Sequence, residues 1–163
     1  MDSRSNRAIF EELSASGGIR VRPAPFFSKP PEPLPPGFDF TRVEGMLLGL
    51  AIGDALGNTS EGMSAGDRRS QYGEIRDYVN GQADPSDDTQ LAFWTLEQMI
   101  ADGGFFPEKV ARRFTQDSIR GIGNTVRHFV AAHGAGRPWH RCADRSAGNG
   151  ALMRIAPVLV PHL

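Results

Sequence analysis

Apolar residues recur at helical spacing along most of the chain. The clearest stripe predicts a helix that begins near Phe40, and its members are Val43, Met46, Leu47, Leu50 and Ala51. Helix start and stop signals predict further helices, which cover residues 7–15, 85–101, 107–117, 123–133 and 149–155. No alternating strand pattern of useful length is present. The sequence therefore predicts an all-α fold with a bundle-like core.

The first core helix also contains glycines at every fourth position, which are Gly45, Gly49, Gly53 and Gly57. Each glycine inside a helix costs about 1 kcal/mol relative to alanine. We therefore expect these glycines to pack closely against a neighbouring backbone. Asp54 lies nearly three turns after Val43 and so shares its apolar face. A carboxylate there must be hydrogen-bonded, paired or near a cation.

Residues 1–40 differ in composition from residues 41–163. Seven of the 12 prolines lie between positions 23 and 36, and such a stretch favours extended polyproline structure. We interpret residues 1–40 as an arm or linker, disordered or docked, and residues 41–163 as the folded part. Residues 58–85 are expected to form a long loop of the kind that often carries function. An apolar run directly precedes Leu163. We expect either that the sequence ends within a domain or that this run packs on the core as a short C-terminus.

Composition excludes several classes of protein. The chain is 39% hydrophobic and 23% charged with a net charge of −1, which does not favour general binding to nucleic acid or to an anionic membrane. The lone cysteine excludes an intrachain disulfide and fits a cytoplasmic setting. The cysteine and four histidines show no zinc-binding spacing, and no segment has the length and apolarity of a membrane span or signal peptide.

Two groups of acidic residues are candidates for chemistry. Ser86, Asp87 and Asp88 bring hydroxyl and carboxylate oxygens together, which suits magnesium or manganese. They also suit an ordinary helix start, where serine caps the backbone and acids favour the helix dipole. Glu61 follows the Gly-Asp-Ala-Leu-Gly segment that contains Asp54. It is either a proton-transferring group over a cleft or a solvated surface residue.

Two glycine-rich segments are candidates for substrate binding. Gly121-Ile122-Gly123-Asn124-Thr125 precedes a predicted helix, where backbone amides favour phosphate, but an ordinary turn explains it equally well. It is not a dinucleotide-binding fingerprint, since it lacks the preceding strand and a third glycine. Ser146-Ala147-Gly148-Asn149-Gly150 suits ribose hydroxyls and a diphosphate. Arg154 could bind phosphate, although we expect an ion pair with a buried carboxylate such as Asp54.

The order and spacing of these motifs over residues 42–160 resemble the ADP-ribosylglycohydrolase family, which includes the dinitrogenase-reductase-activating glycohydrolases. The resemblance implies an all-α fold, incomplete here at the C-terminus, with two magnesium ions, or manganese in their place. It places metal ligands at Ser86, Asp87 and Asp88, with serine where threonine is usual, and makes Glu61 a catalytic residue together with both aspartates. It implies substrate contacts at Gly121, Gly123, Asn124, Thr125, Ser146, Gly148, Asn149 and Gly150.

The same resemblance implies magnesium-dependent hydrolysis of the bond between ADP-ribose and a modified target. The expected partner is an ADP-ribosylated protein or another ADP-ribosylated molecule, with no membrane, and nucleic acid only if it carries the modification. Further metal ligands are expected in a later Asp-x-Asp-Thr/Ser motif that this chain lacks. Arginine-directed nitrogenase-type members have aspartate at the position of Gly121, so the target stays open. The alternatives are a non-catalytic binding module, such as an immunity protein acting through its arm, and an inactive remnant.

Overall fold

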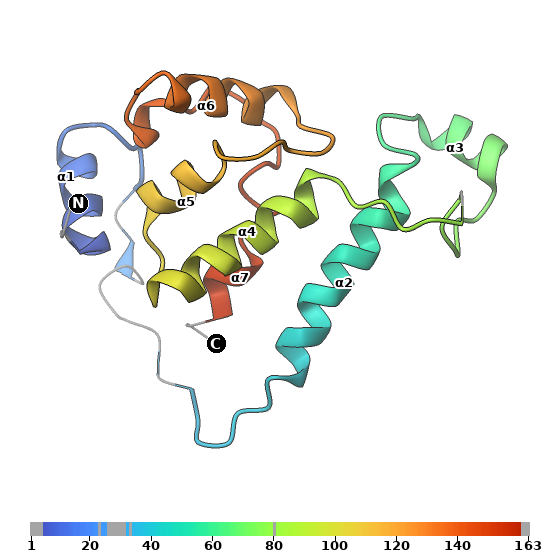
Figure 1. Cartoon of the computed structure of the whole chain (residues 1–163), viewed down its shortest axis with the longest axis horizontal. Coiled ribbons are helices and arrows are strands. Elements are labelled where there is room, and N and C mark those ends of the chain that lie inside the picture. Colours follow the sequence, from blue (N-terminus) through green and yellow to red (C-terminus); the bar gives the residue numbers. More distant parts are fainter. Residues whose placement is uncertain (1–4, 23, 26–31, 33, 80, 161–163) are drawn as a thin grey trace.

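The computed structural model describes residues 5–22, 24–25, 32, 34–79 and 81–160. Within these residues every regular element is helical, which confirms the predicted all-α class (Figure 1). The elements are α1 (Asn6–Ala15), α2 (Thr41–Asn58), α3 (Ala65–Tyr72), α4 (Asp87–Asp102), α5 (Pro107–Arg113), α6 (Asn124–Gly134), the 3-10 turn η2 (Trp139–Arg141) and α7 (Ala156–Leu159).

Helix α4 is the centre of the fold. It packs against α2, α5 and α7, and α5 in turn packs against α6. Figure 1 shows α2 on one side of α4 and the α5–α6 pair on the other. The buried core consists of Leu91, Trp94, Val110, Phe114 and Val126. Because neighbours flank α4 on both sides, residues at its first turn meet both α2 and the segment before α6.

Most predicted helices are present near their expected bounds. The prediction at residues 7–15 is confirmed by α1, whose Leu13 is buried and whose Asn6 side-chain amide donates to the carbonyl of Phe105 at 2.6 Å. Helix α4 ends where predicted, because Gly103 takes the left-handed conformation with φ of 66°. Helix α5 is shorter than the predicted 107–117. Residues 23, 26–31 and 33 of the proline-rich stretch lie outside the described residues.

Two local predictions are wrong. The segment 58–85 is not all loop, because it contains α3 between Ser64 and Gly73. Helix α3 has no buried residue, so it shows no apolar stripe. Its sequence signals are only those of its ends, with Ser64 capping the amide of Asp67 and Gly73 ending the helix at a φ of 65°. The last helix begins at Ala156 instead of occupying 149–155, because Pro157 lies in its first turn, where a missing N–H costs nothing.

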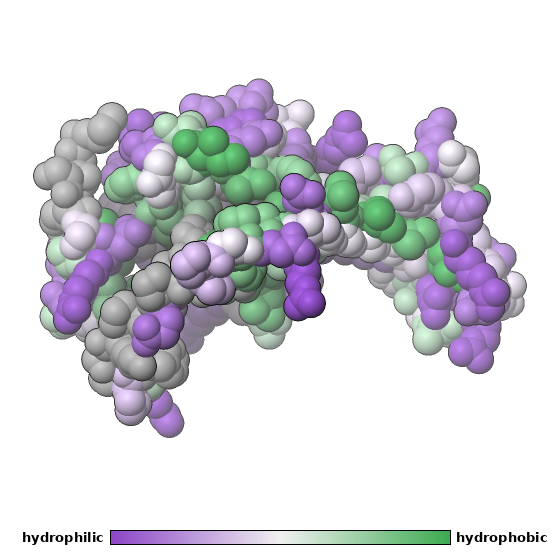
Figure 2. Space-filling view, turned by 90° about the horizontal axis from the view of Figure 1, so that it is seen from below, coloured by the Kyte–Doolittle hydropathy of each residue, from purple (hydrophilic) through white to green (hydrophobic). Residues whose placement is uncertain are grey.

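The predicted close packing of the α2 glycines is also wrong. An added Cβ at Gly45, Gly49, Gly53 or Gly57 meets no atom within 4 Å in the described part of the chain. Helix α2 makes its buried contacts through Val43 and Ala55 instead. Leu48 and Ile52 on this helix are 61% and 50% exposed. Figure 2 shows apolar surface on the underside of the molecule, beside a polar lobe at the right.

The open glycine face gives a stability prediction. Gly45→Ala and Gly53→Ala should each raise the free energy of unfolding by about 0.5–1 kcal/mol, because alanine loses less backbone entropy in a helix. Urea unfolding followed by circular dichroism measures the change. Gly103→Ala is the matched control, and it should lower stability because its φ is positive. Destabilisation by the α2 substitutions would show that this face is packed.

Among the described residues, no helix combines the length and the apolar character needed to cross a lipid bilayer.

Candidate active site

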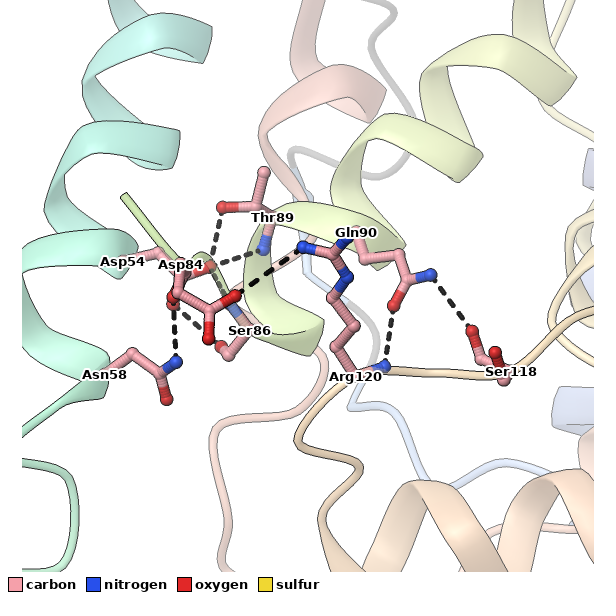
Figure 3. Close-up of polar contacts among 8 residues, drawn as sticks. All are labelled: Asp54, Asn58, Asp84, Ser86, Thr89, Gln90, Ser118 and Arg120. Atoms are coloured by element: carbon pink, nitrogen blue, oxygen red, sulfur yellow. Dashed lines mark hydrogen bonds and ion pairs between the residues drawn. The ribbon is translucent and has the colours of Figure 1, made fainter. Parts of the chain in front are cut away.

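Asp54 of α2 holds the first turn of α4 (Figure 3). Its Oδ1 accepts a hydrogen bond from the Ser86 hydroxyl at 2.7 Å, and its Oδ2 accepts one from the Ser86 amide at 2.8 Å. The same Oδ2 accepts from the amide and hydroxyl of Thr89, at 3.1 Å and 2.6 Å. Both carboxylate oxygens thus accept hydrogen bonds from the start of α4, one on Oδ1 and three on Oδ2. This confirms that the carboxylate on the apolar face of α2 is hydrogen-bonded.

A hollow lies between the end of α2 and the start of α4. Its polar lining comes from Asp54, Asn58, Glu61, Ser86 and Asp88, and its remaining wall from Leu50 and the glycines at 49, 53 and 57. We call this the acidic hollow. Because three glycines lack side chains, the carboxylates face open space there. Glu61 lies exposed at its rim, and its carboxylate makes no hydrogen bond or ion pair with any described residue.

Asp88 experiences uncompensated negative charge in this hollow. Partial burial raises the pKa of its carboxyl above the ordinary value, and the charges of Asp54, Asp87 and Glu61 raise the pKa further. Among the described residues, no lysine or arginine lines the hollow. The site therefore favours either a shared proton or a bound cation.

Asp87 points the other way and connects α4 to the segment before α6. Its side chain is buried, and its Oδ2 accepts a hydrogen bond from the Gly123 amide at 3.3 Å. Gly121 lies beside the same turn with a φ of 57°, and a Cβ on it would sit 3.5 Å from the Cβ of Ser86. The glycines at 121 and 123 therefore let the backbone approach the acidic start of α4 closely.

A second hollow, the loop hollow, lies between α6 and the segment 143–154. Its lining includes Thr125, Asp144, Ser146, Gly148, Gly150 and Arg154. The Thr125 hydroxyl donates to the Ser146 hydroxyl at 3.1 Å, and the Gly148 amide donates to the same oxygen at 3.1 Å. His128 and Asp144 are 2.5 Å apart at their Nδ1 and Oδ2 atoms and also hold this loop on α6.

The family model of ADP-ribosylglycohydrolases matches residues 36–163. This chain belongs to the ADP-ribosylglycohydrolase family. It is 36% identical over 127 residues to an uncharacterized protein of Archaeoglobus fulgidus, an alignment that covers 71% of this chain and 42% of that protein.

Two named relatives are enzymes. The chain is 31% identical over 168 residues to the ADP-ribosylarginine hydrolase Tri1 of Serratia proteamaculans, covering 91% of this chain and 44% of that protein. It is 30% identical over 132 residues to the ADP-ribosyl-[dinitrogen reductase] glycohydrolase of Rhodospirillum rubrum, an alignment that covers 75% of this chain and 45% of that protein. The chain thus spans less than half the length of these family members.

The fold separates the family-implied residues into two groups. Glu61, Ser86 and Asp88 share the acidic hollow, whereas Thr125, Ser146, Gly148 and Gly150 share the loop hollow. Asp87 lies between the two groups through its bond to Gly123. Neither hollow is lined by Gly121, Gly123, Asn124 or Asn149. Gly121 and Gly123 instead contact the start of α4, and Asn124 Oδ1 accepts from Arg127 at 3.5 Å.

The expected ion pair between Arg154 and Asp54 is wrong. The Arg154 guanidinium lies over the Phe114 ring, 5.1 Å from its centroid, and Asp54 instead accepts hydrogen bonds from Ser86 and Thr89. Burial lowers the pKa of Arg154, and the charge of Asp87 opposes that shift. The carboxylate whose charge stabilises the protonated Arg154 is therefore that of Asp87. Arg154 also lines the loop hollow.

The residues present fit part of a site for a hard divalent cation. The hydroxyl and carboxylate oxygens of Ser86 and Asp88 in the acidic hollow suit magnesium, whereas Asp87 points toward Gly123. The raised pKa of Asp88 reflects partial burial first and the charges of Asp54, Asp87 and Glu61 second. Ser86 already donates its proton to Asp54 and accepts from the Asp88 amide at 3.3 Å, which leaves one lone pair free. Within the described ranges, no three His, Cys, Asp or Glu side chains are grouped to hold a metal.

Several residues that shape this site carry no role in the sequence-based prediction. Thr89 donates twice to Asp54, and Gln90 bonds the backbone of the segment before α6. Both belong to the motif that begins at Ser86, but spacing alone does not indicate their partners. Asn58 donates to the carbonyl of Asp84 at 2.8 Å. Asn58 and Asp84 are 26 positions apart in the sequence, so no local pattern predicts this contact.

Proposed function

We propose that this chain supplies one side of the active site of a hydrolase that releases ADP-ribose from a modified protein. The observation that carries the proposal is the first turn of α4. Its serine and first aspartate are buried, its second aspartate faces the acidic hollow with Glu61, and it contacts the glycine loop at 121–123. A turn that served only to start a helix would need neither the burial, nor the carboxylates facing a hollow, nor the contact with the glycine loop. The names of the relatives support ADP-ribose as the released group.

The proposed reaction breaks a bond at the anomeric carbon of ribose through a transition state with oxocarbenium character. Glu61 is our proposed acid/base, because it lies at the rim of the acidic hollow with no competing partner for its carboxylate among the described residues. A carboxylate there can take a proton from water or give one to the leaving group. Asp54 orients the start of α4 and does not contact the substrate.

We further propose that Ser86, Asp87 and Asp88 are ligands of magnesium, whose remaining ligands come from outside the described residues. A divalent cation in such a site polarises hydroxyls and orients water. The surplus of negative charge around Asp88 supports this proposal. Isothermal titration of the protein with magnesium chloride tests it without any substrate.

The loop hollow is proposed to hold the diphosphate and ribose. The hydroxyls of Thr125 and Ser146 and the amide of Gly148 already converge on one another there. Arg154 brings a positive charge to the same lining. Gly150 lines the same hollow, and the proposed contact set also includes Gly121, Gly123, Asn124 and Asn149, which lie outside its lining.

The function is tested by release of ADP-ribose. The purified protein is incubated with a protein carrying ADP-ribosylated arginine, and free ADP-ribose is measured by chromatography. We expect release in magnesium chloride and its loss in EDTA, because EDTA removes the cation that the proposed ligands Ser86, Asp87 and Asp88 would hold. Heat-treated protein controls for spontaneous hydrolysis.

The same samples distinguish hydrolysis from binding alone. If ADP-ribose binds with equal affinity in EDTA and none is released from the modified protein, the hydrolase proposal is wrong. That result would instead support the non-catalytic binding module. Absence of both binding and release would reject both functions for this chain.

A further inference from the structure

Gln90 joins α4 to the segment between α5 and α6 (Figure 3). Its side-chain Nε2 donates to the carbonyl of Ser118 at 3.0 Å. Its Oε1 accepts from the backbone amide of Arg120 at 2.8 Å. One amide side chain therefore satisfies a backbone acceptor and a backbone donor two residues apart, and so fixes both the position and the direction of that segment.

The ion pair between the same segment and Asp84 is weaker. Arg120 pairs with Asp84 at 3.6 Å, but these side chains are 65% and 77% exposed. An exposed pair at that distance contributes little, because water screens it and both side chains lose freedom. Gln90 is half-buried, and its two hydrogen bonds, although exposed, are shorter than this ion pair. Ile119 packs against the core cluster that includes Leu91 and Trp94 of α4. Gln90 therefore adds hydrogen bonds of defined direction to this apolar contact between α4 and residues 118–120.

The segment held by Gln90 leads directly into the proposed site. Gly121 follows Arg120 and lies against Ser86, where its φ of 57° sets the turn. Gly123 comes two residues later and donates its amide to Asp87. A shift of the backbone at Arg120 would consequently move the hydrogen-bond donor that the described residues provide for the Asp87 carboxylate.

We propose that Gln90 is a positioning residue that sets the glycine segment 121–123 against Asp87. It acts through the backbone of Ser118 and Arg120 and does not itself contact substrate. The part that concerns substrate affinity rests on the proposed function, whereas the part that concerns Gly123 and Asp87 does not. The two parts are measured separately.

The test compares Gln90→Met with Gln98→Met. Both glutamines lie on α4 and are half-buried, but Gln98 bonds Asp102 at the far end of the helix. Amide hydrogen exchange of Arg120 and Gly123 should accelerate about tenfold in Gln90→Met and stay unchanged in Gln98→Met, because only the first loses the link. Gln90→Glu keeps the acceptor for Arg120 and loses the donor to Ser118, so it should protect Arg120 better than methionine does.

Affinity for ADP-ribose in magnesium chloride gives the second measurement. We expect Gln90→Met to weaken binding about tenfold, with a melting temperature like that of Gln98→Met. Unchanged exchange at Gly123 in both Gln90 variants would overturn the positioning role, whatever happens to binding. Accelerated exchange with unchanged affinity would overturn its link to substrate. If the parent protein binds no ADP-ribose, the proposed function fails, and exchange at Gly123 alone decides the positioning role.

Discussion

Asp54→Ala is expected to lower the free energy of unfolding by about 3–5 kcal/mol. The carboxylate accepts four hydrogen bonds from Ser86 and Thr89, and those donors would be left without their partner. Ser86 is 6% exposed, so water cannot replace the lost acceptor fully. The melting temperature should fall by about 10 °C. Urea unfolding and thermal denaturation at neutral pH measure both quantities.

Asp39→Ala is the matched control for this prediction. Asp39 also accepts a backbone hydrogen bond, from the Thr41 amide at 2.9 Å, but the contact is exposed at the start of α2. Its loss should cost much less than the loss of the Asp54 carboxylate, because water can replace an exposed acceptor. Equal losses for the two variants would mean that Asp54 contributes no more than an ordinary surface cap.

The paired substitution Asp87→Asn with Asp88→Asn is expected to reduce release of ADP-ribose by on the order of 100-fold or more, equivalent to at least about 2.7 kcal/mol of transition-state stabilisation. It should also abolish the heat of magnesium binding, because amide oxygens carry no charge to hold the cation. Asparagine retains the volume of aspartate, and its side-chain carbonyl at position 87 would still offer an oxygen to the Gly123 amide. Unfolding therefore does not explain the expected loss.

The control removes two other carboxylates from the same chain. Asp67→Asn with Asp77→Asn makes the same change in net charge at exposed positions outside the two hollows. It should leave both release and magnesium binding at the parent level. Hydrolysis at the parent rate by the Asp87 and Asp88 variant would refute the site assignment. Equal losses in both paired variants would point to net charge instead of a specific site.

Helices that bury an apolar stripe could be predicted from sequence, and those without one could not. Helices α4 and α6 fall close to their predicted bounds, because core residues such as Leu91 and Val126 mark one face and glycine marks an end. Helix α3 buries no residue, so no apolar stripe predicts it. Pro157 predicts the end of a helix although it lies in the first turn of α7, because proline suits both positions.

The candidate site shows the same division. The spacing of Ser86, Asp87 and Asp88 predicts oxygen ligands at one helix start, but it does not say which side chain faces which neighbour. Adjacent residues on a helix point about 100° apart. The fold directs Asp88 into the acidic hollow and Asp87 toward Gly123. Arg154 is a second example. Its charge predicts an ion pair with a buried carboxylate such as Asp54, whereas in the structure the charge of Asp87 is the one that raises its pKa.

Periodicity and residue chemistry within a few turns are enough to predict the all-α class, the helix that carries Asp54 and the oxygen-rich start of α4. Three features become visible only in the folded chain. Both oxygens of Asp54 accept hydrogen bonds from α4, three glycines leave the acidic hollow open, and Gln90 holds the segment before Gly121. Each of those outcomes depends on contacts between residues far apart in the chain, or on the space left when helices pack, and neither is encoded in local spacing.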